Sequence, residues 1–156
     1  MTIAATIKRY LDDQGVAYEV VTHSHTGSSM ETAASAHVSG EALAKAIVLK
    51  DDDGFVMAVM PSTHKLEPGM VPELTDRRLE MVGEDELGPL FEDCELGAVP
   101  PLAAAYGLEA VWDEALAQVN QVFFEGGDHA ELVRVSGEDF RKLMGDAPRS
   151  TLSHHI

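Results

Sequence analysis

The chain has 156 residues, of which 45% are hydrophobic and 24% are charged, as is typical of one globular domain. Its formal net charge of −16 argues against broad binding of nucleic acid, which needs many lysines and arginines, so such a partner would be contacted locally. A single cysteine excludes a disulfide within the chain, and no apolar stretch has the length of a signal peptide or membrane span. We therefore expect one cytoplasmic domain over residues 1–156 that does not enter a membrane.

The first third of the chain alternates between helical and extended patterns. Apolar residues recur at helical spacing over residues 2–14, and Gly15 follows as a C-terminal cap. A short strand is predicted at 18–22. A second helix is predicted at 29–38, because Ser29 is a suitable N-cap for the alanine-rich stretch that follows.

Two apolar runs, at 44–50 and 55–60, flank an acidic turn that ends in an Asp-Gly step. This step between two runs of β-forming residues predicts an antiparallel hairpin. The rest of the chain reads as short elements separated by turns. Helices are expected at 71–76, 84–91 and 138–144, strands at 78–82, 110–112, 119–124 and 131–135, and a polar tail at 146–156. The predicted fold class is α+β, with a single mixed, largely antiparallel sheet and surrounding helices.

Lys45 stands at the head of the first run of the hairpin. With a period of two, its side chain shares a face with Ile47 and Leu49. An ammonium group on an apolar face is costly unless an anionic group meets it. Either the side chain snorkels to solvent at the strand end, or it meets a ligand.

Several short motifs in sequential order resemble the YbaK family of aminoacyl-tRNA deacylases, the editing-domain relatives of bacterial prolyl-tRNA synthetase. The resemblance covers roughly residues 2–145. It is carried by Tyr18-Glu19-Val20-Val21, Ala44-Lys45-Ala46-Ile47-Val48-Leu49, the loop Gly97-Ala98-Val99-Pro100-Pro101, Val111-Trp112-Asp113-Glu114 and Gly126-Gly127-Asp128-His129.

This resemblance implies a free-standing trans-editing enzyme that hydrolyses the ester between a wrong amino acid and the 3′ end of its tRNA. Lys45 would be the residue most closely tied to activity, as an anchor for the anionic terminal nucleotide. Backbone N–H groups at Gly97 would stabilise the tetrahedral oxyanion. Pro100 and Pro101 have no N–H group and would stiffen the loop that shapes the substrate pocket.

Further substrate-binding candidates lie elsewhere in the chain. Thr26 and Ser28 stand in a stretch that looks like a phosphate-cradling loop before a helix but lacks the P-loop lysine and spacing, and their hydroxyls are expected at the rim of the pocket. His129 is either an acid or base near the pocket or a residue that caps a turn, and the sequence leaves both open. Asp113 is expected to accept bonds from backbone amides rather than to do chemistry. Ala103 stands where family members often have a glycine, which affects the conformation of the loop.

Metal chemistry is not expected. His23 and His25 would point to one face of an extended segment, but no cysteine or carboxylate stands at a recognised ligand spacing from them. Cys94 has acidic neighbours, which disfavour a reactive thiolate. We therefore expect no metal and no cofactor. The alternative to an enzyme is a non-catalytic module that binds an amino acid or nucleotide and docks on an aminoacyl-tRNA synthetase, itself also a possible partner of an enzyme.

Overall fold

A computed structural model of the chain describes residues 3–23, 38–67, 69–95 and 98–156. Its helices are α1 (Ala5–Asp13), α3 (Met70–Thr75), α4 (Glu84–Leu90) and α5 (Gly137–Met144), with 3₁₀ turns η1 (Ala103–Tyr106) and η2 (Glu114–Ala117). Its strands are β1 (Glu19–Thr22), β2 (Leu43–Asp51), β3 (Gly54–Pro61), β4 (His64–Leu66), β5 (Glu80–Met81), β6 (Glu109–Asp113), β7 (Gln121–Glu125), β8 (Glu131–Ser136), β9 (Arg149–Ser150) and β10 (Ser153–His155).

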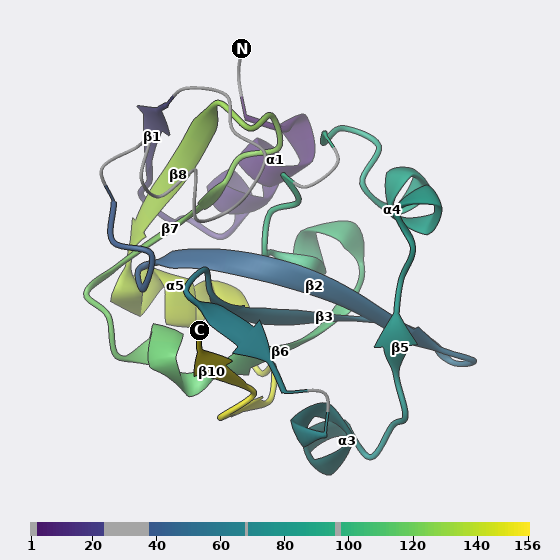
Figure 1. The fold of residues 1–156 in the computed structure, drawn as a ribbon. Helices are drawn as coiled ribbons and strands as arrows, with labels where there is room; N and C mark the ends of the chain where they lie inside the picture. Colours follow the sequence, from purple (N-terminus) through teal and green to yellow (C-terminus); the bar gives the residue numbers. More distant parts are fainter. Residues whose placement is uncertain (1–2, 24–37, 68, 96–97) are drawn as a thin grey trace.

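The described strands form one large mixed sheet and a small second one (Figure 1). The order in the large sheet is β1-β8-β7-β2-β3-β6-β9, with β5 paired to the far end of β2, and β4 pairs with β10 in the small sheet. Neighbours pair antiparallel except β2 with β7, β3 with β6, and β6 with β9. The fold is therefore α+β with a mostly antiparallel sheet, as the sequence predicted.

The hairpin of β2 and β3 is the centre of the sheet. Its register pairs Lys45 with Met60 and closes at Asp51 and Gly54, which confirms the predicted hairpin. The side-chain carboxylate of Asp51 accepts the backbone N–H groups of Asp53 and Gly54 at 2.8 and 3.1 Å, which holds the turn. Asx contacts of this kind are a common reason for aspartate in tight turns.

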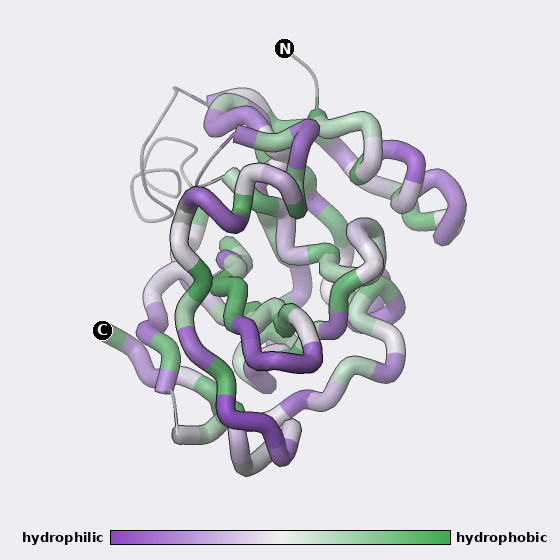
Figure 2. The backbone as a smooth tube through the Cα atoms, turned by 90° about the vertical axis from the view of Figure 1, so that its right-hand side faces the viewer, coloured by the Kyte–Doolittle hydropathy of each residue, from purple (hydrophilic) through white to green (hydrophobic). Residues whose placement is uncertain are grey.

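The two faces of the hairpin contribute to different core clusters. One face packs with α1 and α5 into the larger cluster, which contains Ile7, Leu11, Val48, Val59, Trp112, Phe124 and Phe140. The other face packs into a smaller cluster with Leu49, Val56, Met60, Val71 and Leu152. In Figure 2, hydrophobic stretches of the backbone lie among the segments in the middle of the view, and strongly hydrophilic stretches include the turn at its lower edge.

The ends of α1 and α5 follow the sequence signals. Gly15, which follows the C-cap residue Gln14 of α1, has a φ of +67°, so it takes the left-handed conformation that glycine allows at little cost. The side chain of Ser136 accepts the backbone N–H of Asp139 at 3.1 Å and caps α5. Both predicted helices are confirmed within one to three residues at their ends. The helix predicted at 29–38 lies almost entirely outside the described residues.

The C-terminal segment differs from the expected polar tail, because residues 149–150 and 153–155 form strands and Leu152 is fully buried. Asp113 holds this segment in place. One oxygen of its carboxylate accepts the backbone N–H groups of Leu152 and Ser153 and the hydroxyl of Ser153 at 2.9, 3.0 and 2.6 Å. The other oxygen accepts the N–H of Ala115 at 2.8 Å, so the expected role of Asp113 toward backbone amides is confirmed.

Replacing Asp113 with alanine should destabilise the protein by roughly 3 kcal/mol, because several buried donors then lose a charged acceptor. Urea denaturation followed by circular dichroism measures the change. Asp52→Ala is the matched control, since Asp52 is exposed in the β2–β3 turn and its loss should change stability by less than about 0.5 kcal/mol. Equal urea midpoints for the two variants would contradict the role given to Asp113.

Candidate functional site

The large sheet has a gap along one edge of β2. Strand β7 pairs with β2 at Leu43 and Ala44, whereas β5 pairs with it at Leu49 and Lys50. In Figure 1, β7 and β8 lie beside one end of β2 and β5 lies beside the other. Among the described strands, none covers the edge between these ends, from Lys45 to Val48.

A cavity of about 190 Å³ occupies this gap. Most of its wall is apolar, with Lys45 and Glu125 as the ionisable residues among those that line it. The lining residues are Ala44, Lys45, Ala46, Ile47, Val48, Met81, Val82, Leu87, Val99 and Glu125. A small apolar pocket with a few polar groups is the usual form of a small-ligand site.

Lys45 differs from the next lysine of the same strand. It is half-buried, and no ion pair or hydrogen bond joins its side-chain Nζ atom to any described residue. Burial lowers the pKa of its ammonium group. Lys50, by contrast, contacts Glu86 with its Nζ at 2.6 Å, and this bond raises the pKa of Lys50. The predicted face is confirmed, because Met60, opposite Lys45, packs in the same cluster as Leu49.

The backbone of β2 also faces the gap. The N–H of Val82 donates to the carbonyl of Val48 at 3.2 Å, so Val48 directs its peptide groups toward this edge. Alternate residues of a strand direct their N–H and C=O groups to the same side. The N–H of Ala46 therefore points into the gap beside Lys45, where no described strand pairs with it.

Glu125 enters the site at the end of β7. The register of β7 on β2 ends with Ala44 opposite Phe124, so Glu125 comes one residue further along, beside Lys45. The Oε2 atom of Glu125 lies 3.9 Å from Nε2 of His23, and both side chains are almost fully buried. Sequence reasoning missed Glu125. Its signal was a carboxylate at the end of an apolar strand, directly before two glycines.

The structure brings together two of the predicted parts. Lys45 and the loop that begins at Gly97 meet at the cavity, to which the loop contributes Val99. Pro100 and Pro101 follow it and are buried, outside the lining. Thr26, Ser28 and Gly97 are predicted site residues that lie outside the described part of the chain.

His129 belongs to the turn between β7 and β8 and is likewise not part of the cavity lining. It is buried and has a φ of +59°, a left-handed conformation that is uncommon for residues other than glycine. The carboxylate of Asp128 fixes this turn, since its Oδ1 accepts the N–H groups of Ala130 and Glu131 at 3.0 and 2.9 Å. His129 is thus a buried residue of a fixed turn and lies outside the wall of the cavity.

The segment before the predicted glycine loop is tied to this turn. The N–H of Glu95 donates to the carbonyl of Gly127 at 2.7 Å, and the carboxylate of Asp93 accepts the N–H of Thr6 at 2.9 Å. Cys94 lies between Asp93 and Glu95 in the sequence, and burial raises the pKa of its thiol to about 12. Cys94 is therefore not a thiolate nucleophile at neutral pH. Within the described ranges, no group of three or more histidine, cysteine or acidic side chains has a geometry that would hold a metal ion.

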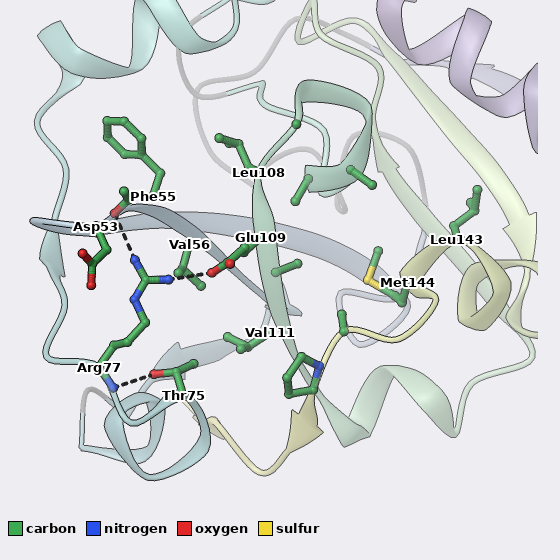
Figure 3. A pocket seen from close by; sticks show the side chains of 17 residues that line it. Asp53, Phe55, Val56, Thr75, Arg77, Leu108, Glu109, Val111, Leu143 and Met144 are labelled. Carbon is green, nitrogen blue, oxygen red and sulfur yellow. Dashed lines mark hydrogen bonds and ion pairs between the residues drawn. The ribbon is translucent and has the colours of Figure 1, made fainter.

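A larger cavity of about 1030 Å³ lies elsewhere, along β6, and shares no lining residue with the first (Figure 3). Its cation, Arg77, is already neutralised. The guanidinium donates twice to the carboxylate of Asp51, at 2.8 and 2.6 Å, and once to Glu109 at 2.6 Å. This cavity therefore offers no unpaired positive charge from Arg77 to an anionic substrate.

The Arg77 contact predicts a specific pH dependence of stability. It lowers the pKa of Asp51 from the usual 3.8 to about 2. A carboxyl group with a depressed pKa in the folded state contributes stability that is present above pH 3.8 and is lost as the pH falls through about 2. When the pH falls from 3.8 to about 2, the free energy of unfolding of Asp51→Asn should therefore decrease less than that of the wild type. Urea denaturation over that pH range measures this, and parallel curves for the two proteins would refute it.

Comparison with known families decides the identity of the fold. The family model described as the aminoacyl-tRNA editing domain matches residues 23–143, which include Lys45, Val99 and Glu125. The chain belongs to the aminoacyl-tRNA editing domain family. Aminoacyl-tRNA editing is thus the general function to which this editing domain is assigned. No curated protein matches the chain significantly.

Solved structures agree on the fold of the editing domain. A protein proposed as a trans-editing enzyme for prolyl tRNA synthetase superimposes with a TM-score of 0.83 and 22% identity, over 96% of this chain and 95% of the other. The hypothetical protein APE2540 gives 0.83 and 21%, over 96% and 99% of the two chains. A scaffold protein for the presentation of linear epitopes gives 0.84 and 22%, over 97% of each. Among the described residues of the editing domain, no helix combines the length and apolar character required to span a membrane.

Proposed function

We propose that this editing domain is a free-standing trans-editing hydrolase that cleaves the ester bond of a mischarged aminoacyl-tRNA. The observation that carries the proposal is the half-buried Lys45, which has no described anionic partner and lines an apolar cavity at a gap in the sheet. A desolvated ammonium group is poorly stabilised alone and gains most from an anionic ligand. The phosphate of the terminal nucleotide of tRNA supplies such a group.

The backbone at the cavity supports a mechanism without a side-chain nucleophile. A water molecule attacks the ester carbonyl carbon. The oxyanion that forms accepts a hydrogen bond from the N–H of Ala46 and further hydrogen bonds from N–H groups of the loop at Gly97. Collapse of the intermediate breaks the bond to the ribose oxygen, which receives one proton of the water. Preorganised backbone donors aimed at an oxyanion commonly contribute a factor on the order of 100–1,000 in rate.

Glu125 is the carboxylate of the cavity wall and is proposed to orient the attacking water, together with the neighbouring ribose hydroxyl of the substrate. Its place beside Lys45 and its distance of 3.9 Å from His23 support a polar end of an otherwise apolar cavity. The cavity volume of about 190 Å³ and its aliphatic lining favour a small, uncharged amino acid side chain. Larger side chains would have to displace Leu87 or Val99.

The charge of the chain supports a local mode of tRNA binding. A net charge of −16 provides little attraction for the length of a tRNA, so the affinity must come from the 3′ end or from a partner that brings the tRNA. We propose an aminoacyl-tRNA synthetase as that partner.

Release of amino acid from alanyl-, cysteinyl-, seryl- and prolyl-tRNA, each mischarged onto a non-cognate tRNA, tests the proposed activity. The hydrolase should release one of these amino acids over several turnovers and should keep its rate in the presence of a chelator. Binding of mischarged tRNA without any release would instead identify the non-catalytic module.

A further inference from the structure

Strand β6 has an open edge over its first half. Strand β3 pairs with β6 from Glu109 to Trp112, whereas β9, on the opposite edge, pairs with it at Trp112 and Asp113. Among the described strands, none continues the sheet beside Ala110 on the β9 side. An open edge presents backbone groups that can pair with another strand.

The hydrogen bonds explain where the pairing stops. The N–H of Trp112 donates to the carbonyl of Pro148 at 3.1 Å, so the N–H and C=O of Ala110, two residues earlier, point to the same edge. In a parallel ladder, the N–H that would donate to the C=O of Ala110 belongs to residue 148. Pro148 has no N–H, so β9 cannot extend toward Ala110.

The cavity of about 1030 Å³ runs along this open edge. Figure 3 looks onto β6, with Arg77 on one side of the strand and Met144 on the other. Phe55, Leu108 and Pro148 contribute apolar side chains that are at least partly exposed in the lining. This cavity, which we call the β6 groove, thus offers the N–H and C=O groups of Ala110 and apolar contacts beside them, as sites that add an extended peptide to a sheet do.

The charge at the groove selects the kind of segment. Arg77 is shared between Asp51 and Glu109, so these three residues together carry a net negative charge. Asp52 and Asp53, in the adjoining turn, are exposed and add further negative charge. This arrangement repels nucleic acid and attracts lysine or arginine. The groove shares no lining residue with the Lys45 cavity, so it is not a part of that site.

We propose that the open edge of β6 is the docking site for an extended segment of a partner protein in which basic residues alternate with apolar ones. The segment adds as a strand beside Ala110, its backbone pairs with the N–H and C=O of Ala110, its apolar side chains contact the groove, and its basic side chains meet the acidic turn at Asp53. This inference is independent of the hydrolytic activity of the Lys45 site.

A fluorescein-labelled peptide of alternating valine and lysine tests the proposal by fluorescence anisotropy with the full chain, and a peptide of alternating valine and glutamate is its control. Ala110→Pro removes the outward N–H but keeps the bonds to β3, whereas Ala110→Ser keeps the N–H. We expect the basic peptide to bind the wild type and Ala110→Ser with similar affinity, and Ala110→Pro at least about tenfold more weakly. Asp53→Lys should also weaken binding.

A measurement on the wild type covers the case in which Ala110→Pro does not fold. Amide hydrogen exchange should show new protection at Ala110 when the basic peptide is added. The proposal is overturned if the basic peptide does not bind, if Ala110→Pro and Ala110→Ser bind it equally, if the acidic peptide binds as well, or if protection appears elsewhere than along β6.

Discussion

Lys45→Ala should reduce kcat/KM for hydrolysis of mischarged tRNA by about 10- to 100-fold, because a charge-assisted contact to the substrate is worth about 1.5–3 kcal/mol. The variant should remain folded, since removing a half-buried ammonium with no described partner relieves a desolvation cost. Lys45→Arg keeps the charge but not the shape, so it should recover part of the rate. Single-turnover release of amino acid at several enzyme concentrations gives kcat/KM for the wild type and the two variants.

Lys50→Ala is the matched control, because Lys50 lies on the same strand but is paired with Glu86. Its activity should equal that of the wild type. Two aminoacyl-adenosine substrates, one with and one without a 5′-phosphate, test whether Lys45 acts through the phosphate. The wild type should prefer the phosphorylated substrate, and Lys45→Ala should treat the two alike. A Lys45→Ala enzyme that retains both full activity and this preference would exclude Lys45 as the anchor.

Gly137→Ala should be the most destabilising single methyl addition at a described glycine. A Cβ at this position would lie 2.2 Å from the backbone oxygen of Val119, whereas real contacts of this kind are not shorter than 3.0 Å. The clash cannot be relieved by a side-chain rotation, and the N–H of Gly137 also bonds to the carbonyl of Asn120 at 2.8 Å. Because α5 begins here and buries Phe140, we expect a loss of about 3 kcal/mol or more.

Gly69→Ala serves as the comparison for this prediction. Gly69 directly precedes α3 with a right-handed backbone (φ −68°, ψ −19°) and has nothing within 4 Å of an added Cβ, so alanine should change stability by less than about 1 kcal/mol. Thermal and urea denaturation should therefore place Gly69→Ala close to the wild type and Gly137→Ala far below it. A Gly137→Ala protein with wild-type stability would mean that α5 can shift away from Val119.

The local features of the hairpin were predictable from the sequence, and its neighbours were not. The Asp-Gly step and the period-two runs are local signals that determine the β2–β3 register. This register in turn determines the face of the sheet on which Lys45 lies. The gap beside Lys45 depends on where β5 and β7 meet β2, which involves residues about 35 to 80 positions away. Period and propensity carry no information on that meeting, so Glu125 and the N–H of Ala46 were missed.

The C-terminal strands were missed for a different reason. β9 has two residues and β10 has three, and their sequence is polar without alternation. These strands are held by contacts to Asp113 and by the burial of Leu152, both of which depend on distant parts of the chain. Short strands stabilised by tertiary contacts leave no periodic signal in the sequence.

The most direct test of the proposed site is a crystal structure of the editing domain with a non-hydrolysable substrate analogue, 5′-phosphoadenosine that carries an amide-linked alanine at its 3′ position. We predict that the methyl group occupies the cavity at Val48, Leu87 and Val99, that the amide carbonyl accepts the N–H of Ala46, and that the phosphate pairs with Lys45. An analogue bound in the β6 groove, or bound with its phosphate away from Lys45, would contradict the assignment of this cavity as the editing site.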